Sequence, residues 1–303
     1  MSDLSADSAL QQRLEAPVLG VRSAPSVQVA SDEWLMAYAA ALGDVDVQYL
    51  DTSRANGIVA HPLFPVCPEW PVWLQSMLDC MPAEVARMGV HATQSLQYLR
   101  PIRVGESLAT RASLGAVRPR RSGLHLTSLL ETEAADGTPV FRSRSGILLR
   151  GVQGEAAGDD VHSDADLLPA RDFLTDQAVA WSEHRRPGAG FAHVYSGCSR
   201  IWNPIHTDVA AARAAGLPSV ILHGTATLAM AVAALCARES QGRHPGRIAA
   251  RFLAPVPLPA VLRIDRLQHC DAGGALRFRV HCESTAADVC IGTVDFLPDG
   301  VSP

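Results

Sequence analysis

The chain has 303 residues, a length that predicts one large domain or two domains of ordinary size. Hydrophobic residues make up 48% of it and charged residues 19%, which is typical of a soluble globular protein with a buried core. The formal net charge of −5 gives no basic footprint, so we expect no nucleic-acid partner.

The cysteines and the apolar segments predict a cytoplasmic protein. Seven cysteines, an odd number without CxxC spacing, are expected to be reduced thiols. The first residues, MSDLSADSALQQRLEAP, contain early acids and no apolar core, unlike a secretory signal. The longest apolar run, ILHGTATLAMAVAALCA, is short, begins with His-Gly and is rich in small residues. We therefore expect a buried helix there and no membrane span.

The first half of the chain predicts helices followed by a run of strands. SDEWLMAYAAAL reads as a short helix with Ser31 or Asp32 as its N-cap, and residues 69–80 predict a longer apolar helix. Four segments of strand length follow, with ADGTP as a hairpin turn between the last two. They are HATQSLQYLRPI, ESLATRASLGAV, LHLTSLLETEAA and PVFRSRSGILLR.

The second half repeats this order after a polar, acidic stretch that predicts a linker at residues 151–172. A long apolar helix is expected at residues 224–238. Four strands should follow, with DAGGA as a turn. The four segments are RIAARFLAPV, AVLRIDRLQH, ALRFRVHCES and DVCIGTVDF. One long helix with a consecutive meander in each half predicts an α+β fold in which each sheet wraps around a central helix.

Three matches in the same order indicate an internal duplication. YAAALGDVDVQYLD and YSGCSRIWNPIHTD share their spacing from tyrosine to aspartate. His61 and His223 each come just before an apolar segment. YLRPIRVGESL then matches FLAPVPLPAVL, aromatic for aromatic and proline for proline. The predicted domains are a first, degenerate repeat at 1–150 and a second repeat at 173–303.

The segments YSGCSRIWNPIHTD and AGLPSVILHGTATLA resemble the MaoC-like dehydratases and (R)-specific enoyl-CoA hydratases. RPIRVGESL and RFLAPVPLPAVL resemble the third-strand region of the same family. The resemblance implies the hotdog fold, and with the duplication it implies a double hotdog of two fused repeats. It also implies the addition of water to, or its removal from, an enoyl or 3-hydroxyacyl thioester.

Within that resemblance, His206 is the expected acid/base, because a neutral imidazole titrates near working pH. The backbone N–H of Gly224, at the start of a helix, is expected to hold the thioester oxygen. His223 reads as a buried positioning group. Asn203 and Asp208 read as side chains that hold the loop through bonds to the backbone. The competing interpretations are that His206 is only a packed core histidine and that Gly224 is only a glycine at the start of a helix.

One position departs from the family pattern, which reads Ser-Gly-Asp-x-Asn-Pro-x-His. Ile201 occupies the position of the aspartate, and isoleucine can neither take a proton nor orient a water molecule. The first repeat shows the reverse, because Asp44 is present but Tyr49 replaces the histidine. Neither repeat therefore carries the complete pair.

Three functions remain open on the sequence. The first is a hydro-lyase acting on a thioester of coenzyme A or of an acyl-carrier protein. The second is another enzyme that needs one base, such as a thioesterase, cyclase or isomerase. The third is a non-catalytic acyl-binding subunit. The sequence points to no cofactor, and its histidines and cysteines do not fall at metal-ligand spacing. A homodimer of double hotdogs is a further possibility.

Overall fold

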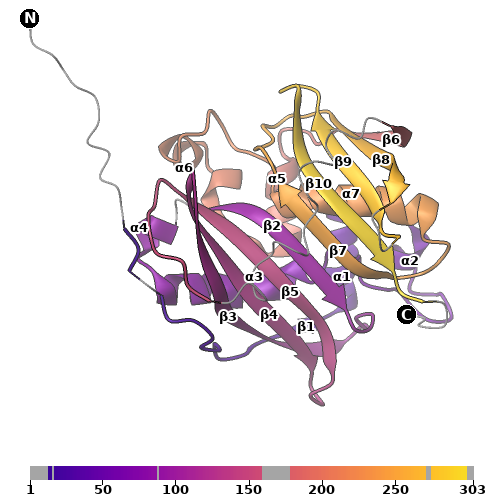
Figure 1. Cartoon of the computed structure of the whole chain (residues 1–303). Coiled ribbons are helices and arrows are strands. Elements are labelled where there is room, and N and C mark those ends of the chain that lie inside the picture. Colours follow the sequence, from indigo (N-terminus) through magenta and orange to yellow (C-terminus); the bar gives the residue numbers. More distant parts are fainter. Residues whose placement is uncertain (1–12, 16, 87–88, 159–177, 271–273, 299–303) are drawn as a thin grey trace, which may run out of the picture.

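The computed structural model describes residues 13–15, 17–86, 89–158, 178–270 and 274–298. Its described strands form one ten-stranded antiparallel sheet in the order β1-β3-β4-β5-β2-β7-β10-β9-β8-β6 (Figure 1). Five neighbouring strands come from the first half of the chain and five from the second. This is the α+β architecture that the sequence predicts.

The first half contributes helices and strands that follow the predicted order. Its helices are α1 (Asp32–Ala41), α2 (Val47–Leu50), α3 (Val66–Cys80) and α4 (Ala83–Ala86). Its strands are β1 (Ser26–Ala30), β2 (Gly89–Tyr98), β3 (Glu106–Arg120), β4 (Gly123–Ala134) and β5 (Pro139–Arg150). The Ser31 side chain caps α1 by accepting from the Trp34 N–H, as predicted for one of two candidate residues.

The second half has the same plan. Its helical segments are α5 (Phe191–Ser199), the 3-10 turn η3 (Pro204–His206), α6 (Val209–Ala214) and α7 (Gly224–Glu239). Its strands are β6 (Val179–Arg185), β7 (Pro245–Phe252), β8 (Leu262–Cys270), β9 (Leu276–Cys282) and β10 (Ala287–Phe296). Most of the predicted linker lies outside the described residues, so the domain boundaries stay a prediction.

The two halves meet where β2 pairs with β7. The register aligns Thr93 with Arg251 and Leu96 with Ile248, and the side chains of Leu96 and Ile248 are fully buried. Backbone hydrogen bonds therefore run without a break from the strands of one repeat to those of the other, and the paired edges are not open to other chains.

The helices pack on the sheet through one shared core. Every residue of α7 from Thr225 to Cys236 is buried, and its many alanines allow close approach to the sheet. The equivalent tyrosines of the two repeats, Tyr38 and Tyr195, meet with their hydroxyl groups 3.4 Å apart. The Tyr195 hydroxyl also donates to the side chain of Thr225 in α7. The two repeats thus share a single interior.

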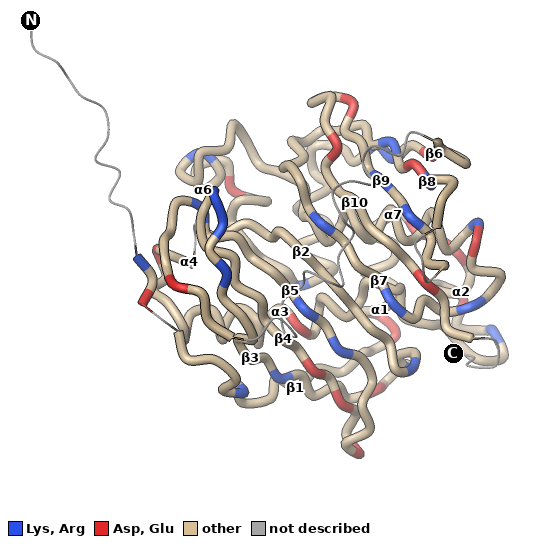
Figure 2. The backbone as a smooth tube through the Cα atoms, viewed as in Figure 1, with Lys and Arg blue, Asp and Glu red and all other residues tan. Residues whose placement is uncertain are grey.

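Charged residues of both signs are interspersed along the backbone in the view of Figure 2. The most buried ionic contact lies in the second repeat, where Arg279 donates to Asp265 at 2.8 Å. Arg263 and Ser182 also donate to this carboxylate. Burial by itself would raise the pKa of Asp265, but the hydrogen bonds from its three partners lower it below its usual value. None of the described helices is long and apolar enough to cross a membrane.

Several histidines are buried, and desolvation is the largest influence on their pKa values. Burial lowers the pKa of His61 to about 3 and those of His91, His206 and His244 to about 4. These imidazoles are therefore neutral in the folded protein near neutral pH.

Gly292 in β10 is expected to tolerate no side chain. An added Cβ would lie 2.2 Å from the buried Phe278 ring and 2.6 Å from the carbonyl oxygen of Ala249, which cannot move aside. Gly292→Ala should therefore lower the free energy of unfolding by about 1–3 kcal/mol in a urea titration. Gly197→Ala in α5 is the control, because nothing lies within 4 Å of its added Cβ. It should be neutral or slightly stabilising.

The buried histidines should make the fold sensitive to acid. Their pKa in the unfolded chain is near 6.5, so below that pH the unfolded state binds protons that the folded state does not bind. For His206, with a folded pKa of about 4, this linkage costs about 2 kcal/mol at pH 5 relative to pH 7. Urea titrations at pH 7 and pH 5 should show a large loss of stability. Equal stability at the two values would contradict the assignment of neutral buried imidazoles.

Candidate active site

The loop that carries His206 is held by its own side chains. α5 ends at Ser199, and Arg200 adopts a left-handed conformation (φ 62°) that turns the chain toward the motif. The Asn203 side chain caps η3 by accepting from the Ile205 N–H. Asp208 caps α6 by accepting from the Ala210 N–H at 2.7 Å. Both polar residues therefore fix the loop locally through bonds to the backbone.

His206 has one ring nitrogen fixed by the backbone. Its Nδ1 lies 2.9 Å from the carbonyl oxygen of Ile221, which can only accept, so Nδ1 carries the proton. Nε2 therefore keeps a lone pair. The side chain is 9% exposed, and burial lowers its pKa to about 4. The result is a neutral imidazole of defined tautomer that can accept a proton.

His223 lies directly against this ring. The two imidazoles stack with their centroids 3.7 Å apart and their planes 23° apart. His223 Nε2 is 3.1 Å from the Ser196 hydroxyl, and the Tyr195 ring packs at 4.8 Å. Burial, followed by the charge of His206, lowers the pKa of His223 well below its usual value. His223 thus sets the plane of the His206 ring and disfavours a second positive charge beside it.

Gly224 is the first residue of α7, immediately after His223 as N-cap. The N–H groups of the first helical turn have no acceptor within the helix, and the helix dipole makes this end favourable for negative charge. A Cβ at Gly224 would lie 3.2 Å from the Phe252 ring, tighter than ordinary contact. Close packing on β7 therefore supplies a reason for glycine that is separate from any role in catalysis.

Two further residues define the surroundings of His206. Ile201, at the position where the family pattern has aspartate, is 5% exposed and belongs to the core. His91 comes from β2 of the first repeat, and its ring lies 4.7 Å from that of Phe252. Burial is the main cause of its lowered pKa, and the charge of His206 contributes. His91 was not predicted as a site residue from the sequence. The only feature that could have indicated it is its position at the start of a predicted strand.

The first repeat contains a counterpart of this arrangement at the other end of α7. Tyr38 packs against His61 with ring centroids 5.5 Å apart, as Tyr195 does against His223. Tyr98 packs against His244 at 4.4 Å, as Phe252 does against His91. Each end of α7 therefore receives residues from both repeats.

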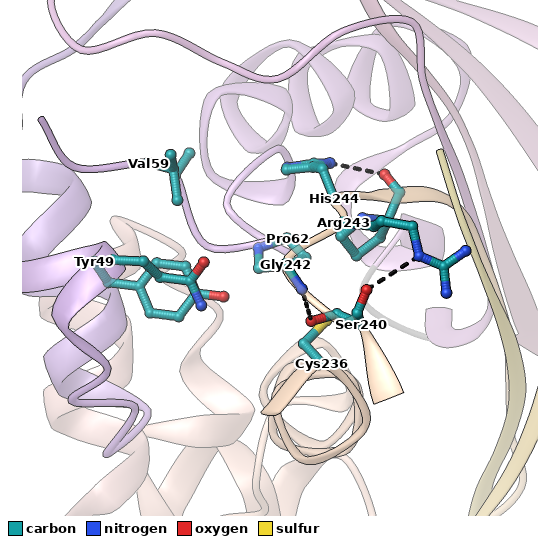
Figure 3. A pocket seen from close by; sticks show the side chains of 11 residues that line it. Tyr49, Val59, Pro62, Cys236, Ser240, Gly242, Arg243 and His244 are labelled. Carbon is teal, nitrogen blue, oxygen red and sulfur yellow. Dashed lines mark hydrogen bonds between the residues drawn. The ribbon is translucent and has the colours of Figure 1, made fainter. Parts of the chain in front are cut away.

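The chemistry of this counterpart differs. Asp44 lies 3.7 Å from Nε2 of His61, so a carboxylate and an imidazole are neighbours here. Tyr49, which the aligned motifs match to His206, lies against the same imidazole and lines a small pocket (Figure 3). Pro62 follows His61 where Gly224 follows His223, and proline has no N–H to donate. Among the described residues no group of three or more His, Cys, Asp or Glu side chains could hold a metal ion.

Family models match both halves of the chain. The MaoC like domain matches residues 190–279, and the FAS1-like dehydratase domain region matches residues 18–142. A curated relative, the peroxisomal enoyl-CoA hydratase 2 of Arabidopsis thaliana, is 28% identical over 181 residues. That alignment covers 55% of this chain and 56% of the relative, so the chain spans about half of the relative's length.

Solved structures share the fold. A MaoC-like dehydratase from Phytophthora capsici superposes with a TM-score of 0.79 at 22% identity, covering 93% of this chain and 97% of that one. The full-length peroxisomal multifunctional enzyme type 2 of Drosophila melanogaster gives 0.74 at 23% identity, over 90% of this chain and 48% of that one. A conserved hypothetical protein of Mycobacterium tuberculosis, described as a double hotdog fold, gives 0.62 at 17% identity, over 92% and 96%. The predicted double hotdog fold is thereby confirmed, and the second repeat is similar to the MaoC like domain.

Proposed function

We propose that this protein is a hydro-lyase that adds water to an enoyl thioester, or removes it from a 3-hydroxyacyl thioester. One observation carries the proposal: His206 presents an unprotonated Nε2 beside the N-terminus of α7, where N–H groups lack acceptors. This geometry supports the proposal, because the reaction requires a base and an oxyanion donor in one site. The name of the plant relative, an enoyl-CoA hydratase, supports the same class of substrate.

In the hydration direction, Nε2 of His206 accepts a proton from water as the water oxygen bonds to C3 of the substrate. The electron pair of the double bond moves toward the thioester, whose oxygen becomes enolate-like. The Gly224 N–H and the helix dipole stabilise that oxygen. A proton returns to C2 from the His206 imidazolium or from solvent. Dehydration is the reverse of these steps.

The absence of a carboxylate at position 201 shapes this mechanism. A neighbouring carboxylate would favour the protonated imidazole and raise its pKa. With Ile201 in its place, His206 acts in the proposed site without a carboxylate partner at position 201, and its low pKa makes it a weak base. We therefore expect slower turnover than in a site with both groups. The carrier, the cytoplasmic location and a homodimer stay predictions.

A thioesterase is the second candidate, because Ile201 leaves a single base, and a single base suffices to direct water at the thioester carbonyl. A non-catalytic acyl-binding subunit is the third. A panel of enoyl and 3-hydroxyacyl thioesters of coenzyme A separates them. Water addition without free thiol supports the hydro-lyase, release of thiol supports the thioesterase, and binding without either supports the third.

His206→Ala should lower kcat by about 10²–10⁴-fold, because it removes the acid/base. The loss is to be measured with the substrate on which the wild type is most active. Circular dichroism should show an unchanged fold. His193→Ala is the matched control, because His193 is an exposed histidine that contacts the carbonyl oxygen of Thr207 near the same loop. Wild-type kcat in a folded His206→Ala protein would remove the catalytic role.

Ile201→Asp tests whether the missing carboxylate limits the reaction. If the substrate is still a simple enoyl thioester, the new carboxylate should raise the hydration rate by supporting the imidazolium of His206. Because Ile201 is buried, the carboxyl should also lower the melting temperature. Ile201→Asn is the control, since it adds polarity without charge. A folded Ile201→Asp protein with no gain on any chain length would favour the thioesterase.

A further inference from the structure

The loop that carries His206 begins at Arg200, which holds a backbone conformation that favours glycine. Its φ is 62°, in the left-handed region. In the aligned motifs Arg200 corresponds to Gly43 of the first repeat, whose φ is 71°. Both repeats therefore make the same backbone turn, but only the first makes it with the residue that adopts it without strain. The reason for an arginine at this position must therefore lie in its side chain.

The side chain of Arg200 is stacked on an aromatic ring of the first repeat. Its guanidinium carbon lies 3.8 Å from the centroid of the Trp34 ring. Trp34 is 4% exposed, and its indole N–H donates to the carbonyl oxygen of Cys198 at 2.9 Å. The ring is thus a fixed platform for the guanidinium. A cation–π contact at the surface at best offsets the strain of the left-handed backbone, so stability alone does not account for the arginine.

The guanidinium of Arg200 is open to solvent and has no anionic partner. Arg200 is an exposed residue. Among the residues that the structure describes, no carboxylate pairs with it and no oxygen accepts a hydrogen bond from its side chain. Stacking on Trp34 occupies only one face of the guanidinium, which leaves the N–H groups at its edges for a ligand. A planar fork of this kind binds a phosphate through two N–H groups.

Arg200 lies next to the site proposed for catalysis. Ile201 follows it directly, and the backbone of Ile201 lies beside the imidazole of His223. His223 in turn stacks on His206, with the ring centroids 3.7 Å apart. Ile201 is buried, whereas its neighbours Arg200 and Trp202 are exposed, Trp202 by 57%. One residue thus separates the buried ring pair from a surface that carries a cation and an apolar ring.

We propose that Arg200, on its Trp34 platform, binds a phosphate of the carrier to which the acyl group is attached. The proposal rests on the proposed function, because it assumes an acyl thioester at His206. Such a thioester reacts at its buried acyl end, while the phosphate of its carrier arm stays at the surface. A carboxylate on the acyl chain is a poorer fit, because it would enter the buried side, away from the exposed guanidinium. The first repeat has no equivalent site, because Gly43 has no side chain.

The test compares two thioesters of one acyl group, with and without a phosphate. Arg200→Gly should raise KM by about tenfold or more for the coenzyme A thioester and leave kcat near wild type, because it removes a charge-assisted contact. The N-acetylcysteamine thioester, which has no phosphate, should show no such rise. Titration calorimetry should show the same loss of affinity for free coenzyme A. Glycine adopts a φ of 62° without strain, so the variant should fold and melt close to the wild-type temperature.

Two further variants and a second ligand sharpen the result. Arg213→Ala is the matched control, because it removes an exposed cation from α6, just after the same loop, and it should leave the affinity for coenzyme A unchanged. Arg200→Lys keeps the charge without the planar fork and should recover only part of the affinity. Calorimetry with 4′-phosphopantetheine identifies the phosphate. A loss with both ligands assigns the phosphate of the arm, and a loss with coenzyme A alone assigns the nucleotide phosphates.

A folded Arg200→Gly protein that binds coenzyme A as tightly as the wild type would overturn the phosphate site. An equal loss of kcat/KM with both thioesters would overturn it too, because Arg200 would then only position the loop. The two proposals fail separately. If the wild type binds coenzyme A through Arg200 but hydrates no enoyl thioester, the hydro-lyase is rejected and the phosphate site stands. Hydration that Arg200→Gly leaves unchanged rejects the phosphate site alone.

Discussion

The antiparallel pairing of β2 with β7 is the contact on which the rest of the structure depends. It joins five strands of each repeat into one sheet, and it covers two edges that would otherwise be open to other chains. It also brings His91 of the first repeat beside Phe252 of the second. Phe252 in turn packs against Gly224, at the start of α7. The stability of the fold and the construction of the candidate site thus follow from one strand pairing.

Burial decides the chemical state of the residues around α7. Removed from water, His206 and His223 stay neutral, and the carbonyl of Ile221 selects which nitrogen of His206 keeps its lone pair. The same desolvation makes His206 a weaker base than a free imidazole. A carboxylate would offset that loss, but the buried Ile201 occupies its position. The buried environment therefore fixes the tautomer of His206 and lowers its basicity.

The two repeats have kept different parts of one arrangement. The second has His206 and a glycine at the start of α7, while the first has Asp44 beside His61 and a proline at the position of that glycine. The two arrangements lie at opposite ends of α7, so the carboxylate of one repeat does not complete the site of the other. This division explains why the motif of each repeat looks incomplete in the sequence.

The sequence by itself determined the α+β class, the order of helices and strands and the internal duplication, because periodicity and spacing are local properties of the chain. It also singled out His206, Gly224 and the replacement at Ile201, since each stands at a fixed offset within a motif. Only the tertiary structure decided that His91 and Phe252 face this region, that His223 stacks on His206, and that Asp44 meets His61. Those contacts join residues far apart in the chain. They depend on the β2–β7 register and on the packing of α7, which no local pattern encodes.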